Sequence, residues 1–563
     1  MDKPLKGQSA NAVPDAGLRS LNHYKMILPT WRYNLRQSIL PLIRWETPYL
    51  AWLQDKARSP ALDSYFAITA NLGTHTFFMV MLPILFWCGS PSFGKGLVHI
   101  LASGVFFTGF VKDLFSLPRP LSPPLQRITM SGSAALEYGF PSTHSANAVS
   151  VAVYSILLLR SPGNTMSDTT KLLLEGVSYF YALSIVVGRL YCGMHGFLDV
   201  IVGSILGAAI GLVEFYYGPP LDAYMHASSW VAPVLAALVI IVLVRIHPEP
   251  ADDCPCFDDS VAFAGVVIGL EFGTWSYGRI PGDPFDTNAH GVRSQDIAAF
   301  GPVVFIARII FGVAIVFAWR EVMKPTLLRA LPHLFRLIER AGLSLPRRFF
   351  KRASEYKFVP PGSRMDTLLP SMRDLPRAVE SIRNPTKRGR SVSIGPQSAA
   401  DAYETLAYRE RRRRESMESN NGSLRSKGSM FELRGGGRGG PVPDLDGNGN
   451  GNGNGNGNGN GATASGVHGP GAGTLGEYEK KMGRGGVLGH PDEEGSTQFP
   501  TLAQEAAEEK EMFSRLVRPR VRYDVEVVTK LVVYAGIAGL GVEVIPLLFE
   551  FVGLGSLHLQ NTA

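Results

Sequence analysis

The chain has 563 residues, and its 55 Lys and Arg outnumber its 48 Asp and Glu to give a net charge of +7. Only 18% of the residues are charged and 45% are apolar, and the apolar residues gather in long runs beside one long segment rich in Gly, Arg, Ser and Asn. This distribution excludes a single soluble globule and also excludes disorder throughout. Four cysteines are too few for a fold built on disulfides.

The N-terminal segment, up to residue 63, starts polar and shows no apolar core of a signal peptide. Within it, residues 36–56 (RQSILPLIRWETPYLAWLQDK) mix charged side chains and two tryptophans, Trp45 and Trp52, with Leu and Ile. Tryptophan favours the membrane interface, and charges are costly in hydrocarbon. We therefore predict an amphipathic helix on the membrane surface rather than a span.

Nine apolar runs follow, some of them short of the about 20 residues that a helix needs to cross a bilayer. They lie near residues 65–88, 94–114, 144–160, 174–193, 197–217, 229–246, 259–276, 297–319 and 526–551. Backbone groups in lipid must be bonded within their own segment, so such spans are helices. The sequence predicts an all-α polytopic membrane protein, a helical bundle with about eight or nine transmembrane helices. About five of them, within 64–217, form the expected catalytic core, and 218–320 and 526–551 supply the others.

The cysteines suggest no shared site. Cys88 lies within one apolar run and Cys192 at the end of another. Cys254 and Cys256 stand in the acidic sequence DDCPCFDD. That composition favours a solvated turn, and a metal site on the two thiols is the weaker alternative.

Three charged residues interrupt the later spans: Glu271, Arg308 and Glu543. Each costs roughly 2.5 kcal/mol or more at the bilayer centre, so each needs a partner. We predict that Arg308 pairs with one of the two glutamates. A pair that holds helices together is favoured over a role in transport.

The chain changes character after residue 320. Residues 321–345 are predicted to form a basic amphipathic helix on the headgroups. In the insert that follows, 346–525, residues 347–434 hold 20 Lys or Arg and 10 Asp or Glu, and seven Gly-Asn repeats cover 447–460. Such a segment buries too little apolar area to offset its ordering entropy, so we expect disorder. Its charge suits contact with anionic lipid, and the lack of interleaved aromatic residues argues against nucleic acid.

Three polar stretches each adjoin the end of an apolar run. Residues 112–120 (KDLFSLPRP) close the second run, residues 140–145 (FPSTHS) open the third, and residues 189–199 (RLYCGMHGFLD) join the fourth to the fifth. When the spans are followed through the bilayer, all three stretches emerge on the same face. A single site at one membrane surface requires such an arrangement.

The cations and hydroxyls of these stretches suit a phosphate. Lys112, Arg119 and Arg189 bring together three positive charges, and Arg binds phosphate oxygens in pairs. Ser142 and Thr143 supply hydroxyls and, at a helix start, free backbone N–H groups. Each residue alone also fits an ordinary role, since cations commonly flank a membrane span. Their occurrence together on one face favours a phosphate site.

His195 and Asp199 are four residues apart, so on a helix they share a face and the carboxylate can hold one imidazole nitrogen. This arrangement activates a histidine as nucleophile or general base. His144 remains as a proton donor for a leaving alkoxide. No carboxylate cluster suggests a metal, and phosphoryl transfer needs mainly positioning and charge stabilisation. We therefore expect phosphoryl transfer without a metal or other cofactor.

The three stretches together resemble a known signature. K-x6-RP starting at Lys112, P-S-x-H ending at His144 and R-x5-H-x3-D ending at Asp199 are similar to the motifs of the type 2 phosphatidic acid phosphatase superfamily. The resemblance covers residues 112–199, and the helical core that it implies runs roughly from 65 to 217. That superfamily includes lipid phosphate phosphatases, glucose-6-phosphatase and vanadium haloperoxidases.

The chain departs from the usual superfamily pattern at two positions. Thr143 stands where Gly is usual, and Gly188 stands where Ser is usual. PSTH, KDLFSLPRPLSPPLQRIT and RLYCGMHGFLD resemble the sphingoid-base 1-phosphate phosphatase branch, so the first departure points to that branch. The second departure removes a hydroxyl that usually contacts the phosphate.

The resemblance implies a mechanism and a location. His195 attacks phosphorus and forms a phosphohistidine, Asp199 orients it, His144 protonates the leaving oxygen, and water then cleaves the intermediate. The phosphoryl oxygens are held by Lys112, Arg119, Ser142 and Arg189. The branch implies metal-independent hydrolysis of dihydrosphingosine, phytosphingosine or sphingosine 1-phosphates in the endoplasmic-reticulum membrane, with the active site facing the lumen.

Two other functions stay open. A broader lipid phosphate or polyprenyl pyrophosphate phosphatase of the same superfamily would carry the same motifs. A transporter or scaffold would use Glu271, Arg308 and the basic insert instead. The span count places the N-terminus, the site and the insert on one face. The positive-inside rule favours the cytosol for this insert, whereas the resemblance favours the lumen for the site.

Overall fold

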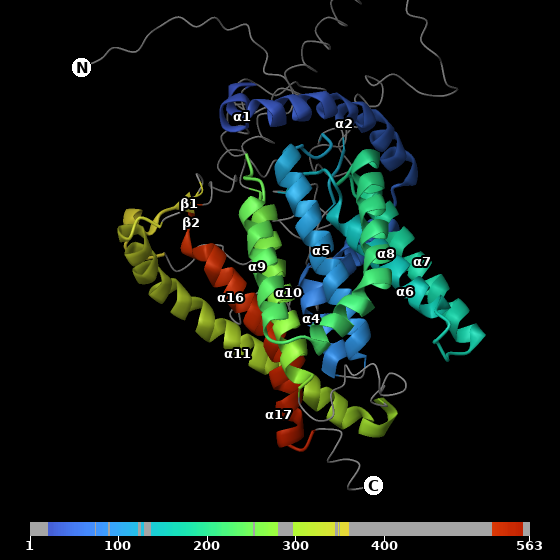
Figure 1. The fold of residues 1–563 in the computed structure, drawn as a ribbon. Coiled ribbons are helices and arrows are strands. Elements are labelled where there is room, and N and C mark those ends of the chain that lie inside the picture. The colour runs from blue at the N-terminus through green and yellow to red at the C-terminus, as the bar shows by residue number, and fades with distance from the viewer. Residues whose placement is uncertain are drawn as a thin grey trace, which may run out of the picture.

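The computed structural model describes residues 21–73, 75–87, 90–121, 125–128, 137–251, 254–279, 297–343, 347, 350–359 and 521–554. Its helices are α1 (Leu21–Ile27), α2 (Thr30–Ala57), α3 (Pro60–Thr69), α4 (His75–Trp87), α5 (Pro91–Phe115), α6 (Thr143–Arg160), α7 (Asp168–Tyr191), α8 (Phe197–Ala227), α9 (Val231–Ile246), α10 (Cys256–Tyr277), α11 (Ile297–Arg340), α16 (Val525–Gly539) and α17 (Ile545–Phe551). The shorter elements are η1 (Ala70–Gly73), η3 (Ala353–Glu355), the π-helical η4 (Leu540–Val544) and the strands β1 (Phe350–Lys351) and β2 (Arg522–Tyr523). Figure 1 shows the long helices gathered in a bundle, with α2 lying across one end of it.

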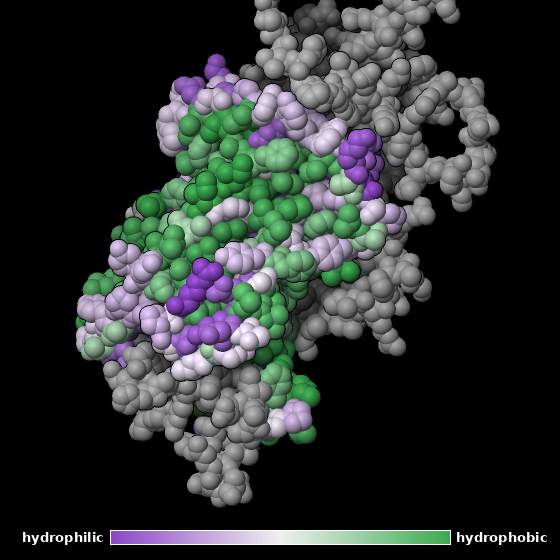
Figure 2. Space-filling model, turned by 90° about the vertical axis from the view of Figure 1, so that its right-hand side faces the viewer, coloured by the Kyte–Doolittle hydropathy of each residue, from purple (hydrophilic) through white to green (hydrophobic). Residues whose placement is uncertain are grey.

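The predicted apolar runs lie on helical segments, and the first run is divided among α3, η1 and α4. Of the described helices, five are long and apolar enough to cross a membrane: α5, α7, α8, α11 from Gly301, and the continuous segment from α16 to α17. The other predicted runs lie on helices that are shorter or more polar. Apolar side chains such as Leu172, Phe180 and Leu183 stand exposed on α7, and Figure 2 shows a broad apolar surface on this side of the molecule. The chain is therefore a multi-pass helical membrane protein.

Helices α6 and α8 approach closely because α8 presents a glycine at every fourth position. A Cβ added at Gly203, Gly207 or Gly211 would meet a backbone oxygen of α6 at 2.5, 2.1 or 2.9 Å respectively. Small residues at this spacing let two helix backbones come into contact within lipid, where packing drives association. The contact fixes α6 against α8, and it places the start of α6 beside the start of α8.

The C-terminal segment returns to the bundle and packs on α10. Gly265 and Gly269 of α10 face the backbone of α16, where an added Cβ would meet the carbonyl oxygens of Leu531 and Ala535 at 2.8 and 1.9 Å. Strand β1 pairs in parallel with β2 just before α16. The predicted insert, residues 346–525, therefore has a strand near each of its ends, β1 and β2. The expectation of disorder for 360–520, Gly-Asn repeats included, falls outside the described residues.

Helix α11 continues past residue 320 without interruption. The expected surface helix at 321–345 is therefore its C-terminal part rather than a separate element. Pro325 and Pro332 lie in this part without ending the helix, although proline removes a backbone donor. Figure 1 shows α11 crossing the bundle obliquely alongside α16.

The predicted pairing of Arg308 with Glu271 or Glu543 is wrong. The Arg308 guanidinium donates instead to the backbone carbonyl oxygens of Trp87 (2.9 Å) and Leu554 (2.8 Å). Trp87 is the last residue of α4, where the last turn leaves acceptors without intrahelical donors, and Leu554 lies three residues beyond the end of α17. Glu543 accepts a hydrogen bond from a serine hydroxyl of α10 (2.6 Å). Arg308 therefore joins the end of α4 to the residues after α17 rather than balancing a carboxylate of the bundle interior.

Glu271 belongs to a buried charged cluster between α5, α8 and α10. His99 lies 3.0 Å from Glu214 and 2.7 Å from Glu271. Lys95 lies 2.7 Å from Asp222 and 3.5 Å from Glu271. Buried charges persist when they are paired with opposite charges, and here three carboxylates surround a lysine and a histidine.

Helix α2 closes the end of the bundle at which the predicted polar stretches lie. Arg32 and Arg36 donate to backbone carbonyl oxygens at the C-terminal end of α5, at 2.9 and 3.0 Å. Cations at this position satisfy the unbonded carbonyls and complement the helix dipole. Trp45 and Trp52 are exposed on the outer side of α2. Its location on a membrane surface stays a prediction.

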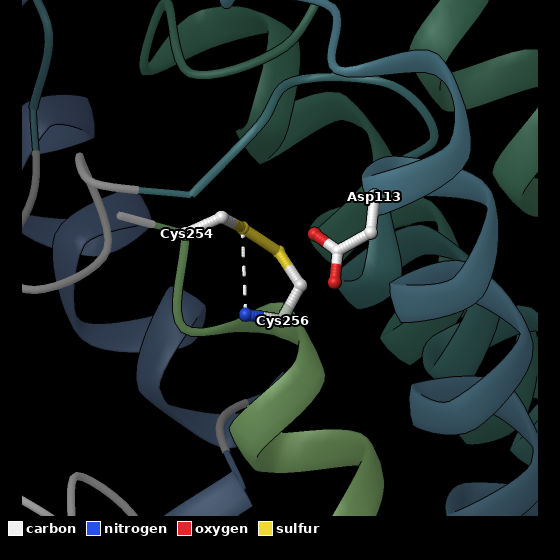
Figure 3. A group of neighbouring side chains, drawn as sticks. All are labelled: Asp113, Cys254 and Cys256. Carbon is white, nitrogen blue, oxygen red and sulfur yellow. Dashed lines mark hydrogen bonds between the residues drawn. A yellow bond between two sulfur atoms is a disulfide. The ribbon is translucent and has the colours of Figure 1, made fainter. Parts of the chain in front are cut away.

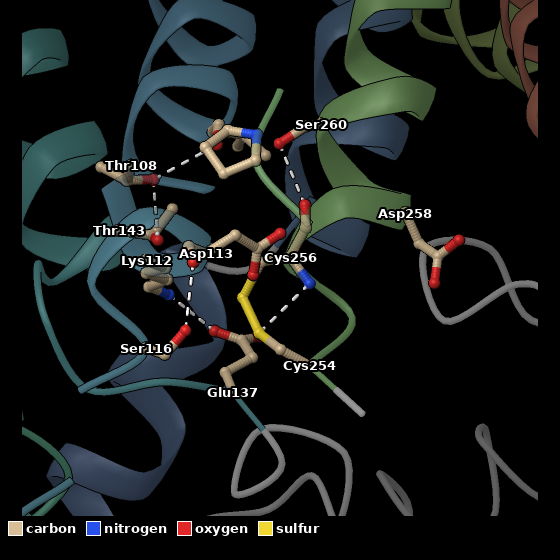
Figure 4. The surroundings of a disulfide bond; sticks show 12 residues. Thr108, Lys112, Asp113, Ser116, Glu137, Thr143, Cys254, Cys256, Asp258 and Ser260 are labelled. Atoms are coloured by element: carbon tan, nitrogen blue, oxygen red, sulfur yellow. Dashed lines mark hydrogen bonds and ion pairs between the residues drawn. A yellow bond between two sulfur atoms is a disulfide. The ribbon is translucent and has the colours of Figure 1, made fainter. Parts of the chain in front are cut away.

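The sequence DDCPCFDD is not a solvated turn. Cys254 and Cys256 are 0% and 4% exposed, and a disulfide joins them at the start of α10. Figure 3 shows the disulfide facing the carboxylate of Asp113 on α5, and Figure 4 shows the wider surroundings of the disulfide. Because both sulfurs take part in the bond, the alternative of a metal site on two free thiols is not what this structure contains.

The cause of this burial lies far along the chain. Asp258 of the acidic sequence pairs with Arg522 (3.4 Å) and with Lys530 (2.8 Å). Both cations come from the C-terminal segment, and all three side chains are buried. A carboxylate with two cationic partners can leave water, so the acidic sequence packs into the bundle.

Candidate active site

The three polar stretches meet at one end of the bundle, against α2. The first stretch follows α5, the second begins α6, and the third joins α7 to α8. The N–H group of Gly139 donates to the carbonyl of Leu117 (3.1 Å), and that of Ser142 donates to the carbonyl of Asp199 (2.9 Å). These main-chain bonds tie the second stretch to both of the others.

His195 lies at the centre of this assembly and is 1% exposed. Its Nδ1 lies 2.9 Å from the carbonyl oxygen of Gly139, and its Nε2 lies 3.1 Å from Nη1 of Arg119. A carbonyl only accepts and a guanidinium only donates, so Nδ1 carries the proton and Nε2 presents a lone pair. Burial, and then the charges of Arg119 and Arg189, hold the pKa of His195 well below its ordinary value. The imidazole is therefore neutral at physiological pH, as a nucleophile must be.

Asp199 supports the loop around His195 more than the imidazole itself. Its Oδ2 accepts a hydrogen bond from the N–H of Gly196 (2.8 Å) and lies 3.6 Å from Nδ1 of His195. The carboxylate therefore caps the start of α8 and lies beside the imidazole. The imidazole Nδ1–H donates its direct hydrogen bond to the carbonyl oxygen of Gly139 instead, a partner that was not predicted from the sequence.

Lys112 and Arg119 converge on one carboxylate, that of Glu137. Lys112 Nζ donates to Glu137 Oε2 (2.9 Å), and Arg119 Nη2 lies 3.7 Å from the same oxygen. Arg119 Nε also donates to the main-chain oxygen of Glu137 (3.0 Å). Burial lowers the pKa of Arg119 to about 10, which leaves the guanidinium charged at neutral pH. Glu137 was not predicted from the sequence, although an acidic residue four positions before P-S-x-H was a usable signal.

Arg189 is a buried cation, and the described residues place no ion-pair partner against it. It is 5% exposed, and within the part of the chain that the structure describes its Nε has no hydrogen-bond partner. Taking a guanidinium out of water is costly unless it is paired. Its charge, after burial and the charge of Arg119, lowers the pKa of His195. A buried guanidinium of this kind suits a bound anion.

Ser142, Thr143 and His144 form the start of α6. Ser142 is the N-cap, and its hydroxyl accepts the N–H of Ser145 (3.3 Å). The Thr143 hydroxyl lies 2.9 Å from that of Thr108 on α5, so it bonds between helices. His144 is partly exposed and lies close enough to lower the pKa of His195. The positive end of the α6 dipole therefore faces the same region as the three cations.

Gly188 faces away from this region. A Cβ added at Gly188 would meet the ring of Phe66 on α3 at 2.8 Å. That ring packs in turn against Tyr191, with ring centroids 4.7 Å apart. A side chain at this position would point at α3, and whether a serine hydroxyl here would contact a phosphate is tested by the Gly188→Ser variant below.

Glu46 of α2 is a further residue that the sequence analysis did not assign. It is 4% exposed, and its Oε1 accepts the N–H of Leu198 (3.0 Å) at the first turn of α8. A Cβ on Gly196 would meet its Oε2 at 2.1 Å, so a larger residue there would displace the Glu46 carboxylate from this position. Burial raises the pKa of Glu46. The signal was an acidic residue within the Trp-rich segment 36–56, which needs a partner outside α2.

The PAP2 superfamily model matches residues 94–221, which include every residue discussed on α5 to α8 at this site. The dihydrosphingosine 1-phosphate phosphatase of Schizosaccharomyces pombe is 38% identical over 322 residues, which cover 57% of this chain and 76% of that protein. The dihydrosphingosine 1-phosphate phosphatase of Saccharomyces cerevisiae is 34% identical over 318 residues, 56% of this chain and 75% of that protein. The sphingosine-1-phosphate phosphatase 2 of Homo sapiens is 23% identical over 298 residues, 52% of this chain and 72% of that protein. The chain belongs to the PAP2 superfamily.

Membership of the PAP2 superfamily confirms the resemblance in the motifs and makes this protein a membrane hydrolase of phosphate esters. No solved structure matches the chain. Among the described residues, two groups of side chains lie close enough to bind one metal ion: Asp113 with the disulfide cysteines, and His99 with Asp222 and Glu271. Neither group includes His195 or one of the cations around it.

Proposed function

We propose that this PAP2 protein hydrolyses sphingoid long-chain-base 1-phosphates to the free base and inorganic phosphate. The relatives in both yeasts carry the name dihydrosphingosine 1-phosphate phosphatase, and the chain shares about three quarters of the length of each. The observation that carries the chemistry is the neutral, buried His195, whose Nε2 faces Arg119. Beside it is the buried guanidinium of Arg189, whose Nε has no hydrogen-bond partner among the described residues. A bound phosphate would supply the missing counter-charge and lie next to the nucleophilic nitrogen.

In the first step, Nε2 of His195 donates its lone pair to phosphorus while the bond from phosphorus to the sphingoid oxygen breaks. His144 gives a proton to that oxygen as it leaves. The Gly139 carbonyl keeps the proton on Nδ1 and the ring in place, and it stabilises the positive charge that the ring gains.

Lys112, Arg119 and Arg189 stabilise the charge that develops on the equatorial oxygens. The position of Arg119 is set before the substrate binds, because it is bonded to the main chain at Met194 (2.7 Å) and at Glu137 (3.0 Å). Preorganised cations in a buried site can supply the stabilisation that a metal ion supplies elsewhere. Hydrolysis in this proposal needs no metal.

In the second step, water attacks the phosphohistidine. His144, deprotonated in the first step, takes a proton from the water as the nitrogen–phosphorus bond breaks. Inorganic phosphate leaves and His195 returns to its neutral form. The same two histidines thus serve both half-reactions.

The proposed location is the endoplasmic-reticulum membrane, with the active site facing the lumen. The disulfide between Cys254 and Cys256 supports this orientation, because disulfides persist in oxidising compartments and are rare in the cytosol. It lies against Asp113, next to Lys112, at the same end of α5 as the site (Figure 4). The charge of the insert argues the opposite way, but long loops follow the positive-inside rule poorly.

The test measures phosphate release in detergent micelles that contain EDTA, with dihydrosphingosine 1-phosphate and phosphatidate as substrates. The wild-type protein is expected to act on the sphingoid substrate, and His195→Ala to lose the activity. His333→Ala, an exposed histidine of α11, is the matched control. Equal release from phosphatidate would keep the chemistry and overturn the substrate class. Loss of activity in EDTA that Mg²⁺ restores would overturn the metal-free mechanism.

A further inference from the structure

Glu137 offers a carboxylate to the interior of the site. Its side chain is 17% exposed, whereas Lys112, its partner, is 3% exposed. Asp199 and Glu46 are 0% and 4% exposed and bind N–H groups at the start of α8. The carboxylate of Asp113 faces the disulfide (Figure 3). Of the carboxylates described around His195, Glu137 is the one that a substrate can reach.

Glu137 binds the same cations that a substrate phosphate needs. Its Oε2 accepts from Lys112 Nζ (2.9 Å) and lies 3.7 Å from Arg119 Nη2. Figure 4 shows the Lys112–Glu137 pair beside the disulfide. When a phosphate dianion enters, its oxygens compete for both cations with twice the charge of a carboxylate. Glu137 then faces the anion with weakened pairing, which is costly at a mostly buried position.

A cation on the substrate itself would remove this cost. In a sphingoid 1-phosphate, the protonated amine stands on the carbon next to the one that bears the phosphate. When the phosphate lies among Lys112, Arg119 and Arg189, this amine reaches the edge of the same group of cations, where the Glu137 carboxylate lies. The Glu137 carboxylate can then pair with the ammonium of the substrate in place of the ammonium of Lys112.

We propose that Glu137 is the ammonium subsite of this enzyme and selects phosphate esters that carry a neighbouring primary amine. This inference rests on the proposed function, whose substrates have that amine. It also explains rejection: phosphatidate places neutral ester groups near the phosphate, so nothing on that substrate would offset the repulsion between its phosphate and the Glu137 carboxylate. A charged group that attracts one substrate and repels another discriminates between them.

The experiment compares two substrates that differ in one charge, dihydrosphingosine 1-phosphate and its N-acetyl derivative, together with phosphatidate. Glu137→Gln keeps the size and polarity of the side chain and removes its charge. We expect kcat/KM toward dihydrosphingosine 1-phosphate to fall about tenfold, because a hydrogen bond between charged groups is lost. We expect kcat/KM toward the N-acetyl derivative and toward phosphatidate to rise, because the competing carboxylate is gone.

The chain offers a closely matched control. Glu175 is 15% exposed and also pairs with a cation, Arg160 (2.8 Å), at the other end of α6 and α7. Glu175→Gln is expected to change none of the three kcat/KM values. Glu137→Asp keeps the charge on a shorter side chain, and it should retain the preference for the free amine if Glu137→Gln fails to fold.

The outcomes separate this inference from the proposed function. A fall of all three kcat/KM values in equal proportion in Glu137→Gln would make Glu137 a positioning residue for the cations and overturn the ammonium subsite. An unchanged preference for the free amine would overturn it as well. Failure of the proposed function shows in the wild-type protein alone, as release of phosphate from phosphatidate and none from dihydrosphingosine 1-phosphate.

Discussion

Helix α5 carries a buried lysine near each end, Lys95 and Lys112, and the balance between positive and negative side chains differs at the two ends. Around Lys95, the cationic partners meet three carboxylates: His99 touches Glu214 and Glu271, and Lys95 touches Glu271 and Asp222. Around Lys112, three cations face one reachable carboxylate, and the nucleophilic histidine is held neutral. Burial is similar at the two ends, so burial does not distinguish a site from a structural network.

The difference in charge balance assigns different roles to the two ends. A matched network loses stability when one member is removed, because its partner is left buried and uncompensated. An unmatched set of cations repels itself and gains stability when an anion binds or when a cation is removed. Stability and activity measurements on single variants can therefore distinguish the structural cluster around Lys95 from the anion-binding site around Lys112.

The largest expected effect is on activity, at Arg189. Arg189→Ala should lower kcat/KM by about a hundredfold to a thousandfold, as the loss of one preorganised donor to a developing negative charge does. Arg189→Lys should recover part of that loss, because it restores the charge without the planar fork. Neither change should lower the Tm in micelles. A markedly lower Tm for Arg189→Ala would show that Arg189 has a structural partner and would break the comparison.

The next effect is on stability, at the balanced end of α5. Glu271→Gln removes the carboxylate that both His99 and Lys95 contact, and it should destabilise the protein by about 3 kcal/mol. Glu543→Gln is the matched control, since that glutamate accepts one hydrogen bond from Ser276. The readouts are Tm and kcat at a temperature where both variants are folded. Equal Tm values for the two variants would contradict the structural role of the cluster.

A smaller effect concerns the proton of His195. Burial and neighbouring cations lower its pKa, so the ring should stay neutral as the pH falls through 6.5, where an ordinary histidine gains a proton. Nitrogen-15 NMR of histidine-labelled protein can follow the ring, with the signal assigned by its absence in His195→Ala. Adding orthovanadate should raise the pKa, because the anion offsets the cations. A ring that protonates at its ordinary pH in the free enzyme would contradict the unbalanced charge.

The helices and the three polar stretches were accessible to sequence analysis because both are local patterns. Apolar runs of span length dictate helices wherever the surrounding medium is lipid. The stretches from Lys112, His144 and Arg189 adjoin helix ends, so counting spans brings them to one face without knowledge of the packing. The roles assigned to these residues stay predictions, which the variants above test.

The remaining features depend on contacts between distant segments, which a linear pattern does not encode. Asp258 packs inward because Arg522 and Lys530 reach it from the C-terminal segment. Arg308 finds two backbone carbonyls rather than a carboxylate. Glu46 reaches the start of α8 only because α2 lies across the bundle. Each of these is a charged residue that sequence analysis could flag as needing a partner, without being able to name it.

The smallest expected effect is at Gly188, where the usual family serine is missing. Gly188→Ser would restore the family hydroxyl, but the new Cβ would meet the Phe66 ring at 2.8 Å and point toward α3. Activity should therefore not rise, and kcat/KM should stay within about threefold of the wild-type value, with a Tm lower by a few degrees from overpacking. The double variant Phe66→Leu with Gly188→Ser should recover the Tm without a gain in kcat. A clear rise in kcat for Gly188→Ser would mean that the new hydroxyl reaches the phosphate. The wild-type site would then lack a hydrogen-bond donor to the phosphate as well as a counter-ion for its cations. If kcat does not rise, the excess of cations around Lys112 remains the feature that distinguishes this end of α5 from the end at Lys95.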